Sequence, residues 1–254
     1  MRKRFVGKIA LITGSSSGIG KAAAIGMAKE GAEGIVIHYS KNVDGANEAA
    51  EEIKQYGTKV LIVKADLKKT EEIKEMINSA VNEFGRIDIL VNNAGMFDYG
   101  VPFLEQSEEL WDAALALNIK APYMCCKYAI PHMPENGGVI VNVASAAAVM
   151  AGGGGAAYTC TKHAVVGLTR ALVFELARKG IRANTVCPGL VRTPMVEATF
   201  QRPELVEKIL GPAGRPGNVD DTTNLILFIA SDDASYIYGD TILVDGGLVI
   251  GERK

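Results

Sequence analysis

Tyr158 and Lys162 stand four residues apart at the start of a predicted helix, so their side chains share one face of it. A free phenol has a pKa near ~10 and is a poor base at neutral pH. A neighbouring ammonium group and the positive end of a helix both favour the phenolate, so we expect them to lower the pKa of Tyr158. A drop of about three units would correspond to ~4 kcal/mol. The pair predicts a general acid/base; the alternative is a partly buried tyrosine beside a surface lysine.

Ser145 closes another predicted strand, where its hydroxyl can hydrogen-bond a substrate oxygen. Four consecutive glycines, at residues 152–155, separate it from Tyr158 and are expected to leave open room above the sheet. A helix cap is the alternative role for Ser145. Ser145 and Lys162 could also form a nucleophile pair for hydrolysis. Ser145 is not part of a Gly-x-Ser-x-Gly elbow, however, and Tyr158 would then have no role.

A turn rich in glycine follows the first predicted strand and leads into a predicted helix. It reads Thr13-Gly14-Ser15-Ser16-Ser17-Gly18-Ile19-Gly20. Glycines let backbone N–H groups approach a pyrophosphate, and a helix N-terminus favours an anion. A tight turn with positive φ would account for one glycine but hardly for three. We therefore expect a dinucleotide site that includes Gly14, Ser16, Ser17, Gly18, Ile19 and Gly20.

The end of the second predicted strand bears on which nucleotide is bound. An NAD site usually has an Asp or Glu there for the ribose 2′-hydroxyl, whereas this chain has Tyr39, Ser40 and Lys41. Without a carboxylate a 2′-phosphate is not repelled, and Ser17, Ser40 and Lys41 can donate to it. NADP(H) is therefore favoured and NAD(H) stays open, because Lys41 as a solvated loop residue is the alternative.

The end of the third predicted strand offers Asp66, followed by Leu67. Asp66 is placed to accept from an adenine amino group, and we expect both residues to contact the cofactor. The alternative for Asp66 is a helix cap or a loop carboxylate.

Short apolar runs alternate with longer amphipathic stretches along the chain. The runs are continuous, as in Ile-Ala-Leu-Ile, which is typical of strands buried on both faces of a parallel sheet. Strands are expected at residues 9–13, 35–39, 60–64, 87–92, 139–144, 182–187 and 241–245, and helices at 18–30, 44–56, 70–84, 108–132, 157–179, 203–210 and 219–231. Pro122 is expected to kink or break the helix at 108–132. The pattern predicts an α/β fold, a doubly wound (Rossmann) parallel sheet of about seven strands in one domain over residues 1–254.

Length and composition fit a globular protein. The chain has 254 residues, of which 48% are hydrophobic and 22% charged, so disorder is not expected. A net charge of −2 without a long basic run offers no surface for nucleic acid. No apolar signal-peptide core follows the basic start and no stretch is suited to cross a bilayer, so the cytoplasm is the expected location.

The cysteines and histidines suggest no metal site. Cys125, Cys126, Cys160 and Cys187 lack metal-ligand spacing and are expected to be small buried hydrophobic residues. The three histidines form no cluster that suggests zinc.

These motifs together resemble those of the short-chain dehydrogenases/reductases in their compact form, over essentially the whole chain. The glycine turn is similar to the family's cofactor motif, and residues 92–95 to its Asn-Asn-Ala-Gly segment. Residues 187–189 and Thr193 resemble the Pro-Gly turn and the threonine that bind the nicotinamide carboxamide, and residues 244–247 the C-terminal strand ending. The family's catalytic tetrad is matched in order and spacing by Asn118, Ser145, Tyr158 and Lys162.

The resemblance implies an NAD(P)(H)-dependent oxidoreductase that interconverts a secondary alcohol and a ketone by hydride transfer. It implies that Tyr158 transfers the proton, Lys162 lowers its pKa and holds the nicotinamide ribose, and Ser145 orients the carbonyl. Asn118 would hold a water that links Lys162 to solvent, or would be a plain helix-kink asparagine. Asn92 would support the sheet end beside the cofactor. Cofactor contacts are further expected of Ala94, Gly95, Pro188, Gly189, Val191 and Thr193.

The resemblance also implies a homotetramer, although apolar helix faces such as Val165, Leu168, Leu172 and Leu176 could equally be core.

The chain departs from the family pattern at Ser17, where many NADP-binding relatives have Arg or Lys, so mixed use of NAD and NADP stays open. Two other functions are alternatives on this fold: a cofactor sensor without turnover, which Tyr158 and Lys162 argue against, and an isomerase, epimerase or dehydratase, whose members typically carry a larger C-terminal substrate domain.

The substrate is not determined by the sequence. Pocket walls are expected from residues 96–101, 146–157 and 192–214, the last a mobile lid in which Arg192, Glu197 and Arg202 are interpreted as solvated charges. Small apolar residues at 146–150 favour a neutral substrate, such as a sugar, a polyol, a steroid or a simple ketone. A 3-oxoacyl thioester on a carrier protein is the competing substrate. Use of NADP would favour reduction.

Overall fold

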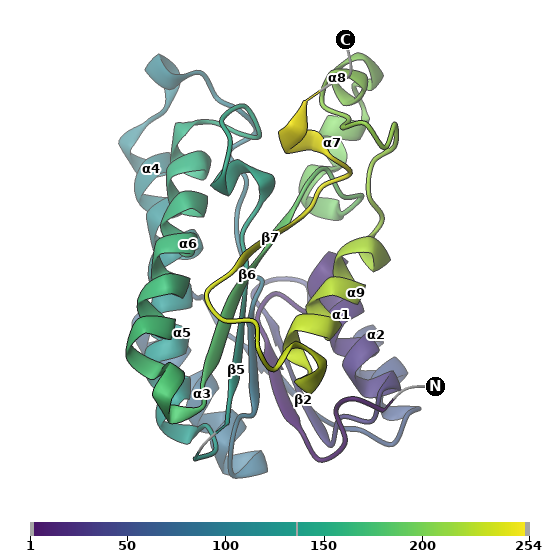
Figure 1. The fold of residues 1–254 in the computed structure, drawn as a ribbon, viewed down its shortest axis with the longest axis vertical. Coiled ribbons are helices and arrows are strands. Elements are labelled where there is room, and N and C mark those ends of the chain that lie inside the picture. Colours follow the sequence, from purple (N-terminus) through teal and green to yellow (C-terminus); the bar gives the residue numbers. More distant parts are fainter. Residues whose placement is uncertain (1–2, 136, 252–254) are drawn as a thin grey trace.

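A seven-stranded parallel sheet forms the centre of the computed structural model, which describes residues 3–135 and 137–251 (Figure 1). The strand order is β3-β2-β1-β4-β5-β6-β7, so the direction in which strands are added reverses between β1 and β4. The strands are β1 Ile9–Ile12, β2 Gly34–Tyr39, β3 Lys59–Lys64, β4 Ile89–Asn92, β5 Val139–Val143, β6 Arg182–Pro188 and β7 Thr241–Val244. The prediction of a doubly wound α/β sheet is confirmed.

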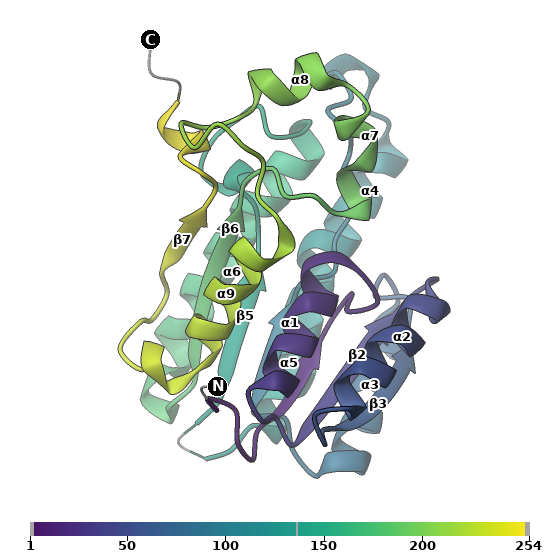
Figure 2. The same cartoon turned by 90° about the vertical axis from the view of Figure 1, so that its right-hand side faces the viewer.

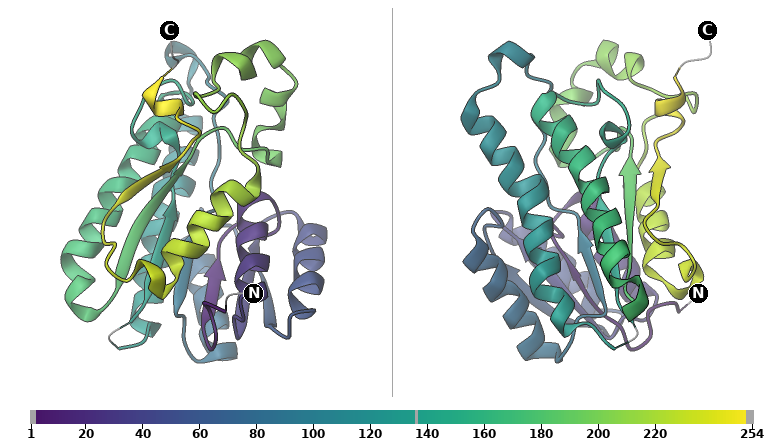
Figure 3. Two further views of the ribbon diagram at one scale, coloured as in Figure 1. Left: turned by 45° about the vertical axis from the view of Figure 1, so that its right-hand side comes forward. Right: turned by 60° about the vertical axis from the view of Figure 1, so that its left-hand side comes forward.

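Four of the central strands are buried along their whole length, as their continuous apolar runs predict. Every residue of β1, β4, β5 and β6 is buried, whereas β3 and β7, at the two edges, are partly exposed. Burial on both faces requires helices on both faces. Figures 1 and 3 show two such layers, with α1, α2 and α9 on one face and α3, α4, α5 and α6 on the other.

The helices follow the amphipathic stretches of the sequence closely. They are α1 Gly18–Lys29, α2 Val43–Lys54, α3 Thr70–Phe84, α4 Glu108–Leu115, α5 Ala121–Ala129, α6 Ala156–Leu176, α7 Glu197–Phe200, α8 Pro203–Lys208 and α9 Val219–Ala230. The sequence patterns did not indicate α7, which has only one turn. Figure 2 shows α7 and α8 above the end of the sheet toward which the strands run.

The long helical region at 108–132 is interrupted earlier than Pro122 suggests. A π-helical stretch, Ala116–Lys120, separates α4 from α5, while Pro122 lies in the first turn of α5. Proline is tolerated in a first turn because its missing N–H would have no partner there. The break is centred instead on Asn118, and π-helical segments are often found at functional sites.

The cysteines depart from expectation at one position. Cys125, Cys126 and Cys187 are buried, but Cys160 is exposed on α6, because the position two residues after the buried Tyr158 faces outward. Within residues 3–135 and 137–251, no helix combines the length and apolar character needed to cross a membrane. In the same part of the chain, no three His, Cys, Asp or Glu side chains gather as a metal site would require.

Candidate active site

The fold brings Tyr158, Lys162 and Ser145 together at the carboxyl end of the sheet. Tyr158 and Lys162 lie on the first turns of α6, 8% and 5% exposed, and the Lys162 ammonium is 5.6 Å from the centre of the Tyr158 ring. Ser145 follows β5 and hydrogen-bonds the Tyr158 side chain. Its Oγ also accepts from the N–H of Ala147 at 3.1 Å and caps a short 3-10 helix. That bond orients the hydroxyl, so the cap expected as an alternative exists alongside the contact with Tyr158.

The pKa of Tyr158 moves opposite to the prediction. Burial, followed by the charge of Asp98, raises it to about 12, against the lowering effect of the Ser145 hydrogen bond. Burial lowers the pKa of Lys162 to about 8, and its Nζ donates to the carbonyl oxygen of Val143 at 3.1 Å. Burial disfavours the charged form of each group, so the phenol keeps its proton more firmly and the ammonium less firmly than in water. In this structure the phenol of Tyr158 is therefore protonated at neutral pH.

Asn118 lies in the π-helical stretch, and its side chain hydrogen-bonds the backbone of the segment after β4. Its Oδ1 accepts from Met96 N at 2.8 Å, and its Nδ2 donates to Met96 O at 3.0 Å and to Thr161 Oγ1 at 3.1 Å. The side chain is 1% exposed. Asn118 therefore fixes the position of the segment that follows Gly95 relative to α6. Its expected water contact stays a prediction.

The glycine turn is fastened to the end of β4 by Thr13 and Asn93. Thr13 Oγ1 accepts from the N–H groups of Asn93 and Ala94 at 2.9 and 3.0 Å, and Asn93 Nδ2 donates to Thr13 O at 3.0 Å. A β-carbon on Gly20 would lie 2.5 Å from Asn93 Nδ2, so this close packing requires glycine. Sequence reasoning gave Thr13 and Asn93 no role of their own, although both belong to the recognised motifs.

The beginning of α1 fits a nucleotide pyrophosphate. Ser17 precedes α1 without a side-chain cap, and no acidic residue stands in the first turn. The first N–H groups of a helix lack partners within it and attract an anion. Gly14 and Gly18 have φ of 65° and 54°. These turns bend the chain between the carboxyl end of β1 and the N-terminus of α1. The predicted cofactor residues of the turn, including Ser16, Ile19 and Gly20, are thus gathered at one helix N-terminus.

His38 holds the glycine turn from the side of β2. It is 2% exposed; its Nδ1 accepts from Gly14 N at 2.9 Å and its Nε2 lies 3.0 Å from Ala65 O. Because Gly14 N is a donor and Ala65 O an acceptor, the ring is neutral with its proton on Nε2. Burial lowers the pKa of His38, which favours this neutral form. In the sequence, this role of His38 was indicated only by its place between the glycine turn and the loop expected to bind the 2′-phosphate.

The end of β2 is open where a 2′-phosphate is expected. Ser40 and Lys41 are exposed and Tyr39 is half-buried. Asn42 ties this loop to the glycine turn, since its Nδ2 donates to Ser16 O at 3.2 Å and its Oδ1 accepts from Gly45 N at 3.0 Å.

The other predicted adenine-side residues are used partly within the protein. Asp66 Oδ1 accepts from Lys68 N at 3.1 Å, in the loop role expected as an alternative, and Leu67 is buried in the core at 4% exposure. Asn92 points into the interior, where its Nδ2 donates to Asn142 Oδ1 at 2.8 Å and to Cys126 Sγ at 3.3 Å. Its side chain therefore supports the sheet rather than facing the cofactor.

The segment after β6 reaches back to the glycine turn. Gly189 packs so tightly on β7 that a β-carbon would lie 2.8 Å from Asp245 Cα, and a β-carbon on Gly18 would lie 3.3 Å from Thr193 Cγ2. Pro188 ends β6, and the buried Val191 forms a bridge with Gly217. The predicted cofactor residues from both halves of the sheet therefore lie together at its carboxyl end.

The expected pocket walls need correction. Ala146, Ala147 and Ala148 are buried in the interior, at 2%, 0% and 4% exposure, so within residues 146–149 only Val149 is exposed. Their short 3-10 helix packs on α6, and this turns the methyl groups inward.

The segment at residues 96–101, also expected as a wall, places aromatic residues beside Tyr158. The Phe97 ring meets the Tyr158 ring edge-on at 5.0 Å, and Tyr99 packs against Phe97 at 5.3 Å. The Tyr99 hydroxyl donates to Met195 O at 3.0 Å and links two predicted walls. Arg192, expected as a solvated charge, stacks 4.4 Å from the Phe200 ring.

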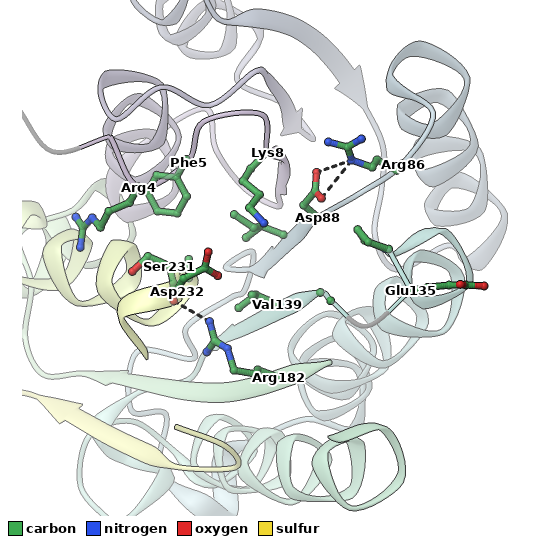
Figure 4. A pocket seen from close by; sticks show the side chains of 15 residues that line it. Arg4, Phe5, Lys8, Arg86, Asp88, Glu135, Val139, Arg182, Ser231 and Asp232 are labelled. Atoms are coloured by element: carbon green, nitrogen blue, oxygen red, sulfur yellow. Dashed lines mark hydrogen bonds and ion pairs between the residues drawn. The ribbon is translucent and has the colours of Figure 1, made fainter. Parts of the chain in front are cut away.

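A separate cavity of about 380 Å³ lies at the opposite end of the sheet, at the amino ends of the strands (Figure 4). Its main charged groups have partners within the fold. Arg86 pairs with Asp88 at 3.0 Å, and the buried Arg182 donates to Ile229 O at 3.1 Å and Ser231 O at 2.8 Å, at the end of α9. Cationic groups commonly satisfy the last carbonyls of a helix. These contacts explain the polar residues as structural, and none of the predicted catalytic residues lies there.

The sequence of the chain matches a family model described as Enoyl-(Acyl carrier protein) reductase over residues 14–249. It is 37% identical to the 3-oxoacyl-[acyl-carrier-protein] reductase FabG of Staphylococcus epidermidis, over 95% of this chain and 98% of that protein. It is 38% identical to dehydrogenase/reductase SDR family member 4 of Caenorhabditis elegans, over 97% of this chain and 96% of that protein.

The fold also matches solved structures of NADP-bound proteins. The angucycline C-6 ketoreductase LanV with bound NADP superposes with a TM-score of 0.91 at 32% identity, covering 99% of both chains. A short-chain dehydrogenase from Burkholderia cenocepacia in complex with NADP gives 0.88 at 31% identity, over 96% of this chain and 99% of that one. The chain belongs to the short-chain dehydrogenase/reductase family, and it is an NAD(P)-dependent oxidoreductase that interconverts ketones and alcohols.

Proposed function

We propose that the protein is an NADP(H)-preferring carbonyl reductase in which Tyr158 donates the proton, acting on CH-OH groups in the reverse direction. The observation that carries this proposal is the state of Tyr158: it is buried, it hydrogen-bonds Ser145, and its pKa is raised to about 12. A protonated phenol next to an oriented serine hydroxyl suits the reduction of a carbonyl, which must gain a proton on oxygen.

Each residue of the tetrad has a distinct part in this mechanism. The hydride would come from a nicotinamide cofactor when one is bound. Ser145 holds the substrate oxygen, with its own hydroxyl oriented by Ala147 N, and Tyr158 gives that oxygen its proton. Lys162 would favour the phenolate that forms, return a proton to it, and hold the nicotinamide ribose. Asn118 keeps the segment at Met96 in place and holds the water through which the proton of Lys162 is replaced.

The preference for NADP(H) rests on the loop after β2. Ser40 and Lys41 are exposed there, and no carboxylate occupies residues 39–41. An Asp or Glu at this point would bind a 2′-hydroxyl and repel a 2′-phosphate. The NADP-bound neighbours support the same preference.

A second candidate is the reduction of a 3-oxoacyl group on a carrier protein. It is favoured by the Staphylococcus epidermidis FabG, which matches over nearly the whole chain. The exposed apolar side chains beyond the sheet edge, such as Phe103 and Leu104 at 75% and 94% exposure, offer a surface for an acyl chain. Both candidates use the same tetrad and differ only in the substrate.

We also propose one domain over residues 1–254, a cytoplasmic location and a homotetramer. An open, mostly apolar groove of about 480 Å³ on α4, α5 and α6 is lined by Leu115, Ile119, Tyr123 and Leu168. Apolar surface of this kind is commonly covered in an oligomer. Light scattering on the purified protein tests this: four chains per particle are expected, and a monomer would contradict it.

The function is tested by titrating the purified protein with NADPH and with NADH, followed through nicotinamide fluorescence, and then adding ketones and a 3-oxoacyl thioester to the tighter complex. We expect tighter binding of NADPH and its oxidation by one of these substrates. Tyr158→Phe should abolish turnover, with an NADPH dissociation constant close to that of the wild type. Turnover by this variant would show that the proton comes from another group.

A further inference from the structure

The helix that carries Tyr158 lacks a cap of its own. The N-cap residue of α6 is Gly155, which has no side chain, and no acidic residue stands in the first turn. The first N–H groups of any helix have no partner within it, and leaving such a group buried and unpaired destabilises the fold. Ala157 and Tyr158 are both buried at this end, so their N–H groups need acceptors from elsewhere.

Two side chains from the segment after β4 supply these acceptors. Asp98 Oδ1 accepts from Gly155 N at 2.7 Å, and its Oδ2 accepts from Tyr158 N at 3.0 Å. Gln106 Oε1 accepts from Ala157 N at 3.2 Å, while its Nε2 donates to Val101 O at 3.0 Å. Asp98 is 3% exposed and also accepts from Gly100 N at 3.2 Å. The first turn of α6 is thus held from outside the helix.

The glycines before α6 make this approach possible. A β-carbon on Gly155 would lie 2.2 Å from Gln106 Nε2 and 2.6 Å from Asp98 Oδ2, and one on Gly154 would lie 2.7 Å from Tyr158 Cδ1. The expectation that the four glycines leave open room is therefore wrong for Gly154 and Gly155. They are the positions where the segment after β4 packs directly on the helix end.

The charge of Asp98 also acts on the phenol. A carboxylate at a helix N-terminus offsets the positive end of the helix dipole, which was expected to favour the phenolate. The other groups that face Tyr158 are the Ser145 hydroxyl, the Lys162 ammonium 5.6 Å from its ring and the thiol of Cys187. Burial raises the pKa of that thiol to about 11, so it is neutral at pH 7. Asp98 is therefore the negative charge among these groups.

We propose that Asp98 is a positioning residue for Tyr158: it fastens the segment at residues 96–106 to the first turn of α6, and its charge opposes the phenolate, so that the site favours carbonyl reduction over alcohol oxidation. This inference rests on the proposed role of Tyr158. Asp98 thereby connects the position of Tyr158 with the shape of the substrate pocket, because the fastened segment includes Phe97 and Tyr99, which pack beside Tyr158.

The test compares Asp98→Asn with Gln106→Met, measuring kcat and KM for reduction and oxidation from about pH 6 to 10. This interval includes the ionisation of Lys162 at about 8 and the rising limb of oxidation below the Tyr158 pKa of about 12. NADPH affinity and Tm are followed in parallel. Asp98→Asn should move the ionisation that limits alcohol oxidation to lower pH by about 0.5–1 unit and lower kcat for reduction about tenfold. Gln106→Met removes a neutral acceptor, so it should lower kcat and Tm without moving that ionisation.

The same shift in both variants, or none in Asp98→Asn, would overturn the proposal and leave Asp98 a structural cap. If Asp98→Asn fails to fold, Gln106→Glu adds a charge at the same helix end and should move the ionisation to higher pH; an unchanged profile would overturn the proposal equally. Activity that survives in Tyr158→Phe would instead contradict the proposed function, whatever the Asp98 variants do.

Discussion

The ammonium nitrogen of Lys162 lies 5.6 Å from the centre of the Tyr158 ring and donates to the carbonyl oxygen of Val143 at 3.1 Å. Burial lowers its pKa to about 8. Since the charged form favours the phenolate that reduction creates, kcat/KM for a ketone should be level below pH 8 and fall as the pH rises through about 8. Initial rates with saturating NADPH check this. In Lys162→Arg the guanidinium stays charged, so any remaining activity should not fall as the pH rises through 8. If this variant still loses activity above pH 8, the loss belongs to another group.

Replacing Lys162 should stabilise the protein while inactivating it. The pKa of Lys162 in the folded protein, about 8, is below its ordinary value of 10.5. The unfolded chain therefore binds more protons between these values, and the free energy of unfolding rises with pH across that interval. Lys162→Met removes a buried charge and should raise this free energy by about 1–3 kcal/mol at pH 7.

Urea unfolding of Lys162→Met, beside the exposed control Lys41→Met, measures this difference. The control should unfold like the wild type, because Lys41 is exposed. A Lys162→Met protein less stable than the wild type would mean that the bond to Val143 O outweighs the burial of the charge.

Lys41 should discriminate between the two nucleotides. It is exposed in the loop after β2, so it can pair with a 2′-phosphate but has no partner on a 2′-hydroxyl. Lys41→Ala should weaken NADPH binding about fivefold, which corresponds to ~1 kcal/mol, and leave NADH binding unchanged. Fluorescence titrations at low and high salt measure both constants. Equal losses for the two nucleotides would remove the argument for NADP(H) preference.

His38 should make cofactor binding sensitive to acid. Its folded-state pKa is lowered from 6.5 by burial, so stability and the shape of the glycine turn are kept above that pH and lost as the pH falls below it. Protonation would place an N–H on Nδ1, facing the N–H of Gly14. In His38→Asn an amide oxygen can accept from Gly14 without titrating, so NADPH affinity should depend less on pH between roughly 5 and 7. The exposed His163→Asn variant is the control; a slope in His38→Asn equal to that of the wild type would contradict this role.

Local patterns in the sequence determined the elements and the chemistry that they carry. Continuous apolar runs gave the buried strands, because only a sheet covered on both faces hides such residues entirely. The glycine turn and the spacing of Tyr158 and Lys162 are also local: a strand, a turn and a few helical residues suffice to place them. For the same reason the family could be recognised from the order and spacing of its motifs along the chain.

Contacts between distant residues decided the rest. Asp98 and Tyr158 are sixty residues apart, and no periodicity predicts that a carboxylate will accept from that N–H or that the pKa of the phenol will rise. The inward turn of Ala146–Ala148 and the outward position of Cys160 depend likewise on how α6 packs. Ionisation and burial are set by the groups that surround a side chain in space, and only the tertiary structure brings those groups together.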